Sequence, residues 1–242
     1  MTRSMSGWRA AVAAFAAAAA GHDDALAATI QVELVGVLGV RQQRLPEARV
    51  VAALAEPALA RAGQATADLE RPRLLARLGA MAEEHGELPL AERLLLEAGR
   101  QMRAHLPAAD PRLAKIEDLL ASVYLRGGQL ERALDHYRRA LDHSEQALGP
   151  DHPQVADVLN NLAATYRKLH QIPAQRAALR RALAIVGQLP EYVSTPILLH
   201  NLGSLELDAG HLADAEDLYA RALAARRARL GGAHPDVASS LA

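Results

Sequence analysis

The stretch LLASVYLRGGQLERALDHYRRAL, Leu119–Leu141, decides the fold because the chain repeats it. A second copy, NLAATYRKLHQIPAQRAALRRAL, occupies Asn161–Leu183. The copies share a leucine, a small residue, a tyrosine and a later alanine: Leu120, Ala121, Tyr124 and Ala140 in the first, and Leu162, Ala163, Tyr166 and Ala182 in the second. Self-similarity at a period of about 42 residues indicates a repeat array, in which each unit buries its apolar face against the next.

Further copies lie on both sides of these two. The same step back from Leu120 leads to Leu78, and a copy around Leu202 follows Leu162 at a slightly shorter step. A weaker copy around Val35 precedes them all. In each unit, apolar residues recur at intervals of three and four on either side of a short turn, which is typical of two amphipathic helices. The sequence therefore predicts an all-α solenoid of antiparallel helix hairpins.

Small residues mark where the two helices of each hairpin should approach most closely. Examples are Ala133 in one unit and Gly203 with Ala215 in another, where a larger side chain would cost about 1–3 kcal/mol by overpacking. The third clear unit departs from this pattern, with His170 in place of the turn glycine and Gln175 in place of the alanine. We expect that hairpin to be looser, and the superhelix to change pitch near Pro190.

Composition narrows the function classes. The 242 residues are 50% hydrophobic with a formal net charge of -1, which gives no bulk charge to draw nucleic acid. The absence of cysteine excludes disulfides and Cys-ligated metals and suits a cytoplasmic protein. No phosphate loop, H-E-x-x-H, G-x-S-x-G or kinase catalytic set occurs, so we expect no enzyme activity, cofactor or metal. No stretch is apolar enough to span a membrane.

The two ends of the chain leave alternatives open. The alanine run Ala10–Ala20, which follows Arg9, has the outline of a secretory signal, but alanine is also the best helix former. We favour an Ala-rich helix over residues 1–24. At the other end, AHPDVASSLA begins a first helix without the polar cap that terminal repeats need. This predicts either a fragment of a longer array or self-association through the C-terminal end.

The repeat pattern resembles the tetratricopeptide repeat. The period of the repeats and the linkers LGPDHP, Leu148–Pro153, and LGGAHP, Leu230–Pro235, resemble its kinesin-light-chain type, in which the second helix is extended. The resemblance covers residues 71–242 well and residues 25–70 poorly, so we expect a degenerate repeat at 25–70 and an array over 71–242 that ends in a partial repeat. It implies a right-handed superhelix with a concave groove.

The histidines and aspartates before the helices have two interpretations. His152 and His234 each precede a proline, and GHDD occupies Gly21–Asp24. A metal or catalytic role would need a second ligand at i+4, which the linker histidines lack. We therefore expect Asp151 or His152 to cap the helix that begins at Pro153, and GHDD to form a turn and cap.

Two asparagines, Asn160 and Asn161, lie inside a predicted helix that their side chains weaken. The resemblance implies that first-helix asparagines such as Asn161 and Asn201 grip the main chain of an extended peptide. The predicted peptide-binding residues are Asn160, Asn161, Arg167, Lys168, His200, Asn201, Arg126 and Asp118. The alternative is that an asparagine bonds to a neighbouring helix or to water.

Two functions follow as expectations. The first is a non-enzymatic scaffold that binds a peptide or protein segment in the groove. The second comes from the N-terminal stretch GHDDALAATIQVELVGVLGVRQQRLPEA, Gly21–Ala48, which together with the repeats resembles the repeat regions attached to bacterial serine/threonine kinases. In that case the chain is a sensor or regulatory region of a larger signalling protein.

Overall fold

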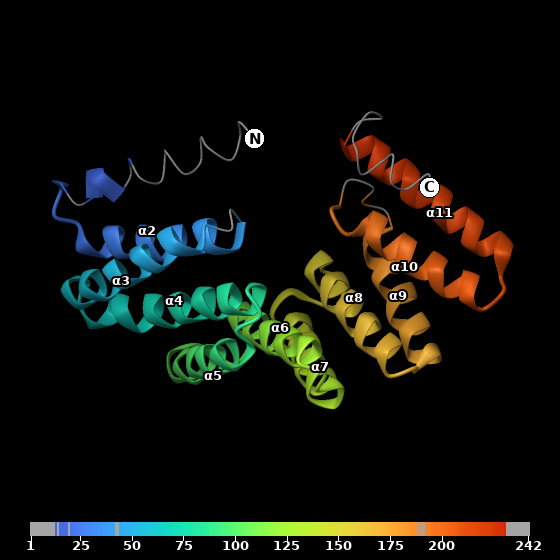
Figure 1. Ribbon diagram of the computed structural model, residues 1–242, viewed down its shortest axis with the longest axis horizontal. Helices are drawn as coiled ribbons and strands as arrows, with labels where there is room; N and C mark the ends of the chain where they lie inside the picture. Colours follow the sequence, from blue (N-terminus) through green and yellow to red (C-terminus); the bar gives the residue numbers. More distant parts are fainter. Residues whose placement is uncertain are drawn as a thin grey trace. The chain divides into compact units, whose positions relative to one another are not determined.

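The computed structural model describes residues 13, 15–18, 20–41, 44–187, 189 and 192–230. Within these ranges every regular element is helical, which confirms the all-α fold predicted from the repeats. The helices form two compact units, α2 to α6 and α7 to α11 (Figure 1).

From Asp24 on, the described residues of the first unit form two hairpins and one further helix. Its elements are α2 (Asp24–Gly36), a π-helical turn η1 (Val37–Arg41), α3 (Leu45–Ala62), α4 (Gln64–Glu84), α5 (Leu88–His105) and α6 (Pro111–Arg126). Helix α2 pairs with α3, α4 pairs with α5, and α6 packs against α5. The predicted repeat boundary between residues 70 and 71 falls inside α4, because that helix begins directly after Gly63, which has a positive φ, and continues through Pro72.

The second unit continues the same plan. Its helices are α7 (Leu130–Leu148), α8 (Pro153–Lys168), α9 (Ile172–Val186), α10 (Thr195–Asp208) and α11 (Leu212–Leu230). Helix α7 packs against α8, α8 pairs with α9, α9 contacts α10, and α10 pairs with α11. Each first helix therefore contacts both its own partner and the second helix before it, as stacked repeats require.

The hairpins close tightly where small residues were predicted. A Cβ atom on Gly203 would lie 3.1 Å from the ring of Tyr219, and one on Gly79 would lie 2.7 Å from Leu95 Cγ. Ala91 and Ala215 are almost fully buried. Close helix approach at these positions leaves no room for larger side chains.

The hairpin turns share one hydrogen-bonding scheme. The residue after each turn donates its backbone N–H to a carbonyl five residues back, as in a Schellman motif. These bonds are Glu87 to Ala82, Gln129 to Tyr124, Gln171 to Tyr166 and His211 to Glu206, at 2.8 to 2.9 Å. His170 keeps this scheme with a φ of 56°, although side chains rarely adopt that conformation.

Helix starts follow the capping prediction. His152 Nδ1 accepts a hydrogen bond from the Gln154 backbone N–H at 3.2 Å, with Pro153 as the first residue of α8. Asp23 accepts from the Leu26 N–H at 2.9 Å at the start of α2. These contacts confirm the cap interpretation of both motifs.

The segment before α10 is fastened to α8. Tyr192 donates its hydroxyl to Asp157 Oδ2 at 2.8 Å, and Ser194 donates to Asp157 Oδ1 at 2.5 Å. Burial, with help from the Asp157 carboxylate, raises the pKa of the Tyr192 hydroxyl above its ordinary value. These bonds fix where α10 starts relative to α8, and so they help to shape the surface between the two helices.

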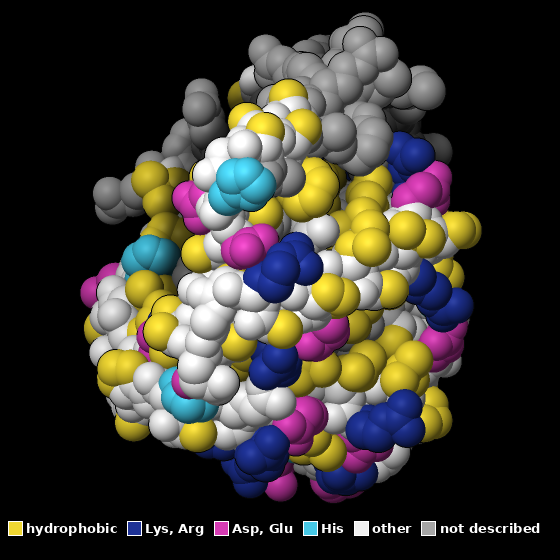
Figure 2. Space-filling model, turned by 90° about the vertical axis from the view of Figure 1, so that its left-hand side faces the viewer, with side chains coloured by type: hydrophobic (Ala, Val, Ile, Leu, Met, Phe, Trp, Pro, Cys, Tyr) yellow, Lys and Arg dark blue, Asp and Glu magenta, His cyan; other side chains and the backbone are white. Residues whose placement is uncertain are grey.

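One face of the first unit mixes charges of both signs. Figure 2 shows Lys and Arg side chains next to Asp and Glu, with hydrophobic side chains between them. Ion pairs at 2.8 to 3.2 Å account for part of this pattern: Arg49 with Glu87, Arg61 with Asp24, and Arg71 with Glu56. Exposed pairs of this kind each contribute about 0–1 kcal/mol.

Several predictions concern residues outside the described ranges. They include the start of the Ala-rich segment, most of the second linker with His234, Pro190, and the C-terminal partial repeat with its proposed self-association. Among the helices that the structure describes, none combines the length and the apolar character that crossing a membrane requires.

Candidate functional site

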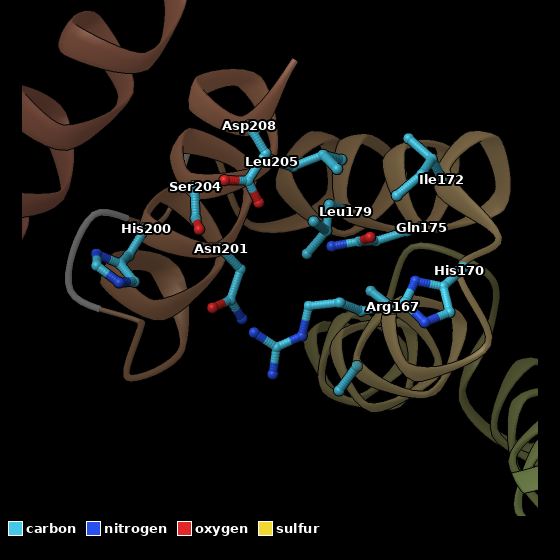
Figure 3. Close-up of a pocket in the computed structure, with 12 residues that line it drawn as sticks. Arg167, His170, Ile172, Gln175, Leu179, His200, Asn201, Ser204, Leu205 and Asp208 are labelled. Carbon is cyan, nitrogen blue, oxygen red and sulfur yellow. The ribbon is translucent and has the colours of Figure 1, made fainter. Parts of the chain in front are cut away.

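A cavity of about 340 Å³ opens in the second unit between α8, α9 and α10. Its buried floor consists of Ala163, Gln175, Leu179 and Leu205. Its rim includes the exposed side chains of Arg167, His170, His200 and Asp208, and the half-buried Asn201 and Ser204 (Figure 3). A concave space with an apolar lining and a few convergent polar groups is typical of a binding site.

The floor carries one polar side chain. Gln175 is only 5% exposed, and its Oε1 atom is buried without a hydrogen-bond partner among the described residues. Figure 3 shows its amide end extending from α9 toward the side of the cavity that carries Asn201. A buried acceptor without a partner costs about 1–3 kcal/mol, so the free protein holds this group at a cost.

The rim carries charges of both signs. Arg167, at the end of α8, and Asp208, at the end of α10, form no ion pair with another residue of the described ranges. In Figure 3 the Arg167 guanidinium and the Asn201 amide point toward one another. The rim therefore offers a ligand the cation of Arg167, the anion of Asp208 and the amide of Asn201.

Asn160 and Asn201 form a direct link between first helices. Asn201 Nδ2 donates to Asn160 Oδ1 at 2.9 Å, which joins α10 to α8. This contact is the helix-to-helix alternative that the sequence left open. The pair uses only part of the hydrogen-bonding capacity of its two amides, so Asn201 Oδ1 can still accept from a ligand at the cavity.

Three of the eight predicted residues, Arg167, His200 and Asn201, line this one cavity. Asn160 lies beside them through its bond to Asn201. Asn161 and Lys168 belong to α8 but not to the cavity lining. Their predicted peptide-binding role stays a prediction.

Arg126 and Asp118 belong to the first unit. Arg126 donates to the backbone carbonyl of Glu83 and, at 3.1 Å, to its carboxylate. Asp118 pairs with Lys115 at 2.8 Å on the same helix. The Arg126 contacts join α6 to α4, so its guanidinium has a structural role within the unit.

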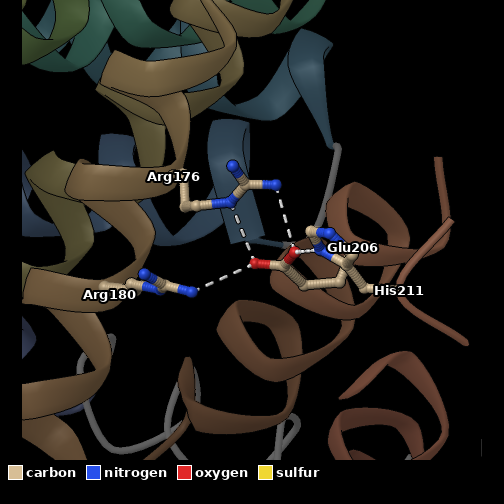
Figure 4. A network of polar contacts seen from close by, with 4 residues as sticks. All are labelled: Arg176, Arg180, Glu206 and His211. Atoms are coloured by element: carbon tan, nitrogen blue, oxygen red, sulfur yellow. Dashed lines mark hydrogen bonds and ion pairs between the residues drawn. The ribbon is translucent and has the colours of Figure 1, made fainter. Parts of the chain in front are cut away.

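A carboxylate behind the cavity holds α9 against α10. Glu206 is almost fully buried and accepts two bonds from Arg176, at 3.0 and 3.1 Å (Figure 4). Arg180 lies 3.5 Å from Glu206 Oε1, and His211 Nδ1 donates to Oε2 at 2.8 Å. The His211 bond, followed by the bonds and charge of Arg176 and the charge of Arg180, holds the pKa of the Glu206 carboxyl below its ordinary value.

This network stabilises the walls of the cavity. Its members alternate along the chain with cavity residues: Gln175 precedes Arg176 on α9, and Leu205 precedes Glu206 on α10. The cavity side chains therefore project from two helices that are held together by an ion pair with a buried carboxylate. In the part of the chain that the structure describes, no group of three potential metal ligands comes together.

Family comparison agrees with the repeat pattern and the hairpins. Residues 112–188 and 198–236 match two models described as tetratricopeptide repeat. The chain contains tetratricopeptide repeats. The resemblance to this repeat that was drawn from the sequence is thereby confirmed.

Solved structures with the same fold include kinesin-light-chain relatives. The repeat protein is similar to BtubC (BKLC) from P. vanneervenii, with a TM-score of 0.77 and 24% identity over 94% of this chain and 92% of that one. It is also similar to the nearly identical TPR-like repeats of a kinesin light chain from Podosopora anserina, with a TM-score of 0.64 and 19% identity over 81% and 93%. At these identities the likeness shows the fold alone.

A third similar structure is aspartyl phosphate phosphatase F from Bacillus subtilis. The TM-score is 0.70 with 16% identity, over 84% of this chain and 51% of that one. The tetratricopeptide repeat protein therefore corresponds to about half of this relative, and the likeness again concerns the fold.

Gln175 and Ser204 are cavity residues that the sequence-based site does not include. For Gln175 the signal was available, because glutamine replaces the alanine of the other tetratricopeptide repeats and His170 replaces their glycine. Both substitutions line the same cavity. The sequence suggested a looser hairpin, whereas the turn keeps its hydrogen bond and the departure produces a polar cavity floor.

Proposed function

We propose that this tetratricopeptide repeat protein is a non-enzymatic scaffold that binds an extended segment of a partner protein across α8 and α10. The observation that carries the proposal is the cavity between these helices, with Asn201, Arg167 and Asp208 on its rim and an unpartnered amide oxygen of Gln175 on its floor. Its fold supports a role in protein interaction, since repeat arrays present extended surfaces to partners.

The rim suits a polypeptide because a main chain alternates donors and acceptors. Asn201 can accept from a peptide N–H, and Arg167 can donate to a peptide carbonyl, without either residue requiring a particular sequence. One side chain of the segment would then enter the cavity. An extended segment fits this arrangement because its side chains alternate between opposite faces.

Affinity capture from a host lysate tests the proposal, with bound proteins identified by mass spectrometry and binding mapped to a synthetic segment of the partner. The test variant is Arg167→Ala with Asp208→Ala, two exposed rim residues without an ion pair among the described residues, whose loss should leave the fold intact. The matched control is Asp217→Ala with Arg221→Ala, an exposed ion pair on α11 that is 3.1 Å long.

We expect wild type and control to hold the same segment and the rim variant to lose it. Equal binding by all three proteins would place the partner elsewhere. A rim variant with altered circular dichroism would be replaced by Arg167→Lys, which keeps the charge but removes the planar donor fork.

The second function is a sensor or regulatory region of a larger bacterial signalling protein such as a serine/threonine kinase. The observation that favours it is the N-terminal stretch Gly21–Ala48, whose described residues include α2, η1 and the start of α3. A coding sequence that continues in frame into a kinase domain would support it. In either case we place the protein in the cytoplasm, in keeping with its lack of cysteine.

A further inference from the structure

We propose that the cavity recognises a neutral primary amide, and that its ligand is a glutamine side chain of the bound partner segment. This inference rests on the proposed function and deepens it, because it names the residue that the cavity selects. The carrying observation is Gln175, a buried side chain that lines the cavity and whose Oε1 atom lacks a hydrogen-bond partner within the described residues.

The location of Gln175 in its repeat shows that packing does not require it. The corresponding residues of three other repeats are Ala91, Ala133 and Ala215, each at most 2% exposed. An alanine there leaves no polar group to satisfy, whereas glutamine buries an amide oxygen without a hydrogen-bond partner. His170, which carries a positive φ at the position of a turn glycine, adds a second local cost beside the same cavity. Uncompensated groups of this kind cluster at binding sites.

The chemistry of the Gln175 amide restricts which ligand groups can satisfy its hydrogen bonds. Gln175 carries an acceptor and a donor side by side, so rotation of its amide toward the cavity lets a second primary amide form two parallel hydrogen bonds with it. A hydroxyl can bond to the donor or to the acceptor of Gln175 but not to both in this geometry, and an ammonium or guanidinium cannot accept a hydrogen bond from it. A carboxylate cannot donate, and it would repel Gln175 Oε1.

Burial argues against a charged ligand group. A charged ligand group on the floor would lose its hydrating water and would gain only a neutral amide and the apolar side chains of Leu179, Leu205 and Ala163 as neighbours. This desolvation costs free energy. The charges of the cavity, on Arg167 and Asp208, lie at the exposed rim. A neutral head avoids this desolvation cost.

The cavity also fits the stem of a glutamine. Leu179, Leu205 and Ala163 provide apolar walls for methylene groups, and about 340 Å³ exceeds what one side chain needs. The floor is buried while the rim is exposed, so a ligand with its main chain at the rim must reach inward. Glutamine has one more methylene than asparagine, which favours it as the residue that spans this depth.

Selection from a random-peptide display library tests the inference, because the library takes the place of the partner. The baits are the wild type, Gln175→Met and Gln175→Glu. Methionine keeps the length and apolar stem of glutamine, and glutamate keeps the oxygen but replaces the donor by a charge. Circular dichroism and thermal unfolding establish that each bait is folded before selection.

We expect the wild type to enrich peptides with one fixed glutamine. The Met variant should replace that glutamine by an apolar residue, and the Glu variant should replace it by lysine or arginine. Changing the fixed glutamine of a selected peptide to leucine should weaken binding to the wild type by about tenfold, and to the Met variant by far less.

The outcomes separate the inference from the proposed function. Peptides that bind the wild type through the rim residues but show no amide preference would overturn the inference and leave the scaffold function standing. A preference that is the same for all three baits would also overturn it. A folded wild type that selects no peptide would count against both.

Discussion

Asn201 donates its side-chain N–H to the side-chain oxygen of Asn160 at 2.9 Å, and this bond joins consecutive first helices of the repeat array. The same asparagines were expected from the sequence to hold a peptide main chain. The structure gives the pair a contact of its own, so the two roles predict different responses to mutation.

Asn201→Ala should lower the free energy of unfolding by about 1 kcal/mol, because a half-buried hydrogen bond between helices is lost. Urea denaturation of Asn160→Ala, of Asn201→Ala and of the double variant measures this contribution. The double variant should cost less than the sum of the singles, since the residues share one bond. Fully additive losses would show that the bond contributes nothing to stability.

Arg176 and Arg180 should differ strongly in their contribution to the Glu206 network. Arg176→Met leaves the buried carboxylate without its two-bond partner and should cost about 2–3 kcal/mol, somewhat below a fully broken buried pair because Arg180 and His211 remain. Arg180→Met should cost under about 1 kcal/mol, because its side chain is 64% exposed and lies 3.5 Å away. Equal losses in thermal unfolding would contradict this ranking.

Glu206 should also make stability depend on pH in the acid range. Its pKa is lower in the folded protein than its ordinary value of 4.5, so the folded state binds this proton less readily than the unfolded state. The stabilisation is therefore complete above about pH 5 and is lost as the pH falls through the lowered pKa. Urea denaturation between pH 7 and pH 3 should show a steeper acid loss in the wild type than in Glu206→Gln. The same dependence of stability on pH in both proteins would argue against this role of Glu206.

His170→Gly should raise the stability of the protein by about 0.5–1 kcal/mol. A positive φ of 56° is costly for histidine and free for glycine, although glycine gains more entropy on unfolding. Gly210→Ala is the matched control, because its φ of 81° should make the alanine variant less stable. Melting temperatures of the two variants should move in opposite directions from the wild type.

Gln175→Met should raise the free energy of unfolding by about 1 kcal/mol, because the variant removes a buried acceptor that has no partner while keeping the volume of the side chain. Chemical denaturation with and without a selected glutamine peptide measures it. The wild type should gain stability from that peptide and the variant should gain little. A variant less stable than the wild type in the absence of peptide would show that Gln175 supports the fold instead.

The repeats made most of the architecture accessible from the sequence. Leucine, alanine and tyrosine recur at fixed positions because each hairpin must bury the same stripe against the same neighbour. Turn positions such as Gly210 could also be predicted from the sequence, since a positive φ favours glycine. The cap at His152 followed from the proline beside it.

The site was accessible only in part. Sequence spacing placed Arg167, His200 and Asn201 on the same face of consecutive first helices, and all three line the cavity. The spacing gave no means of seeing that Asn160 bonds to Asn201, because that depends on the distance between two helices. It also gave no means of seeing that Arg126 binds Glu83 in its own unit.

The sequence by itself determined the repeat, its helix hairpins and the two positions, His170 and Gln175, where one repeat departs from the others. These features depend on local periodicity and turn geometry, which are properties of neighbouring residues. Only the tertiary structure decided what those departures produce. Packing of α8, α9 and α10 leaves the amide oxygen of Gln175 without a partner on the cavity floor, because whether a polar group is satisfied depends on which atoms from distant parts of the chain surround it.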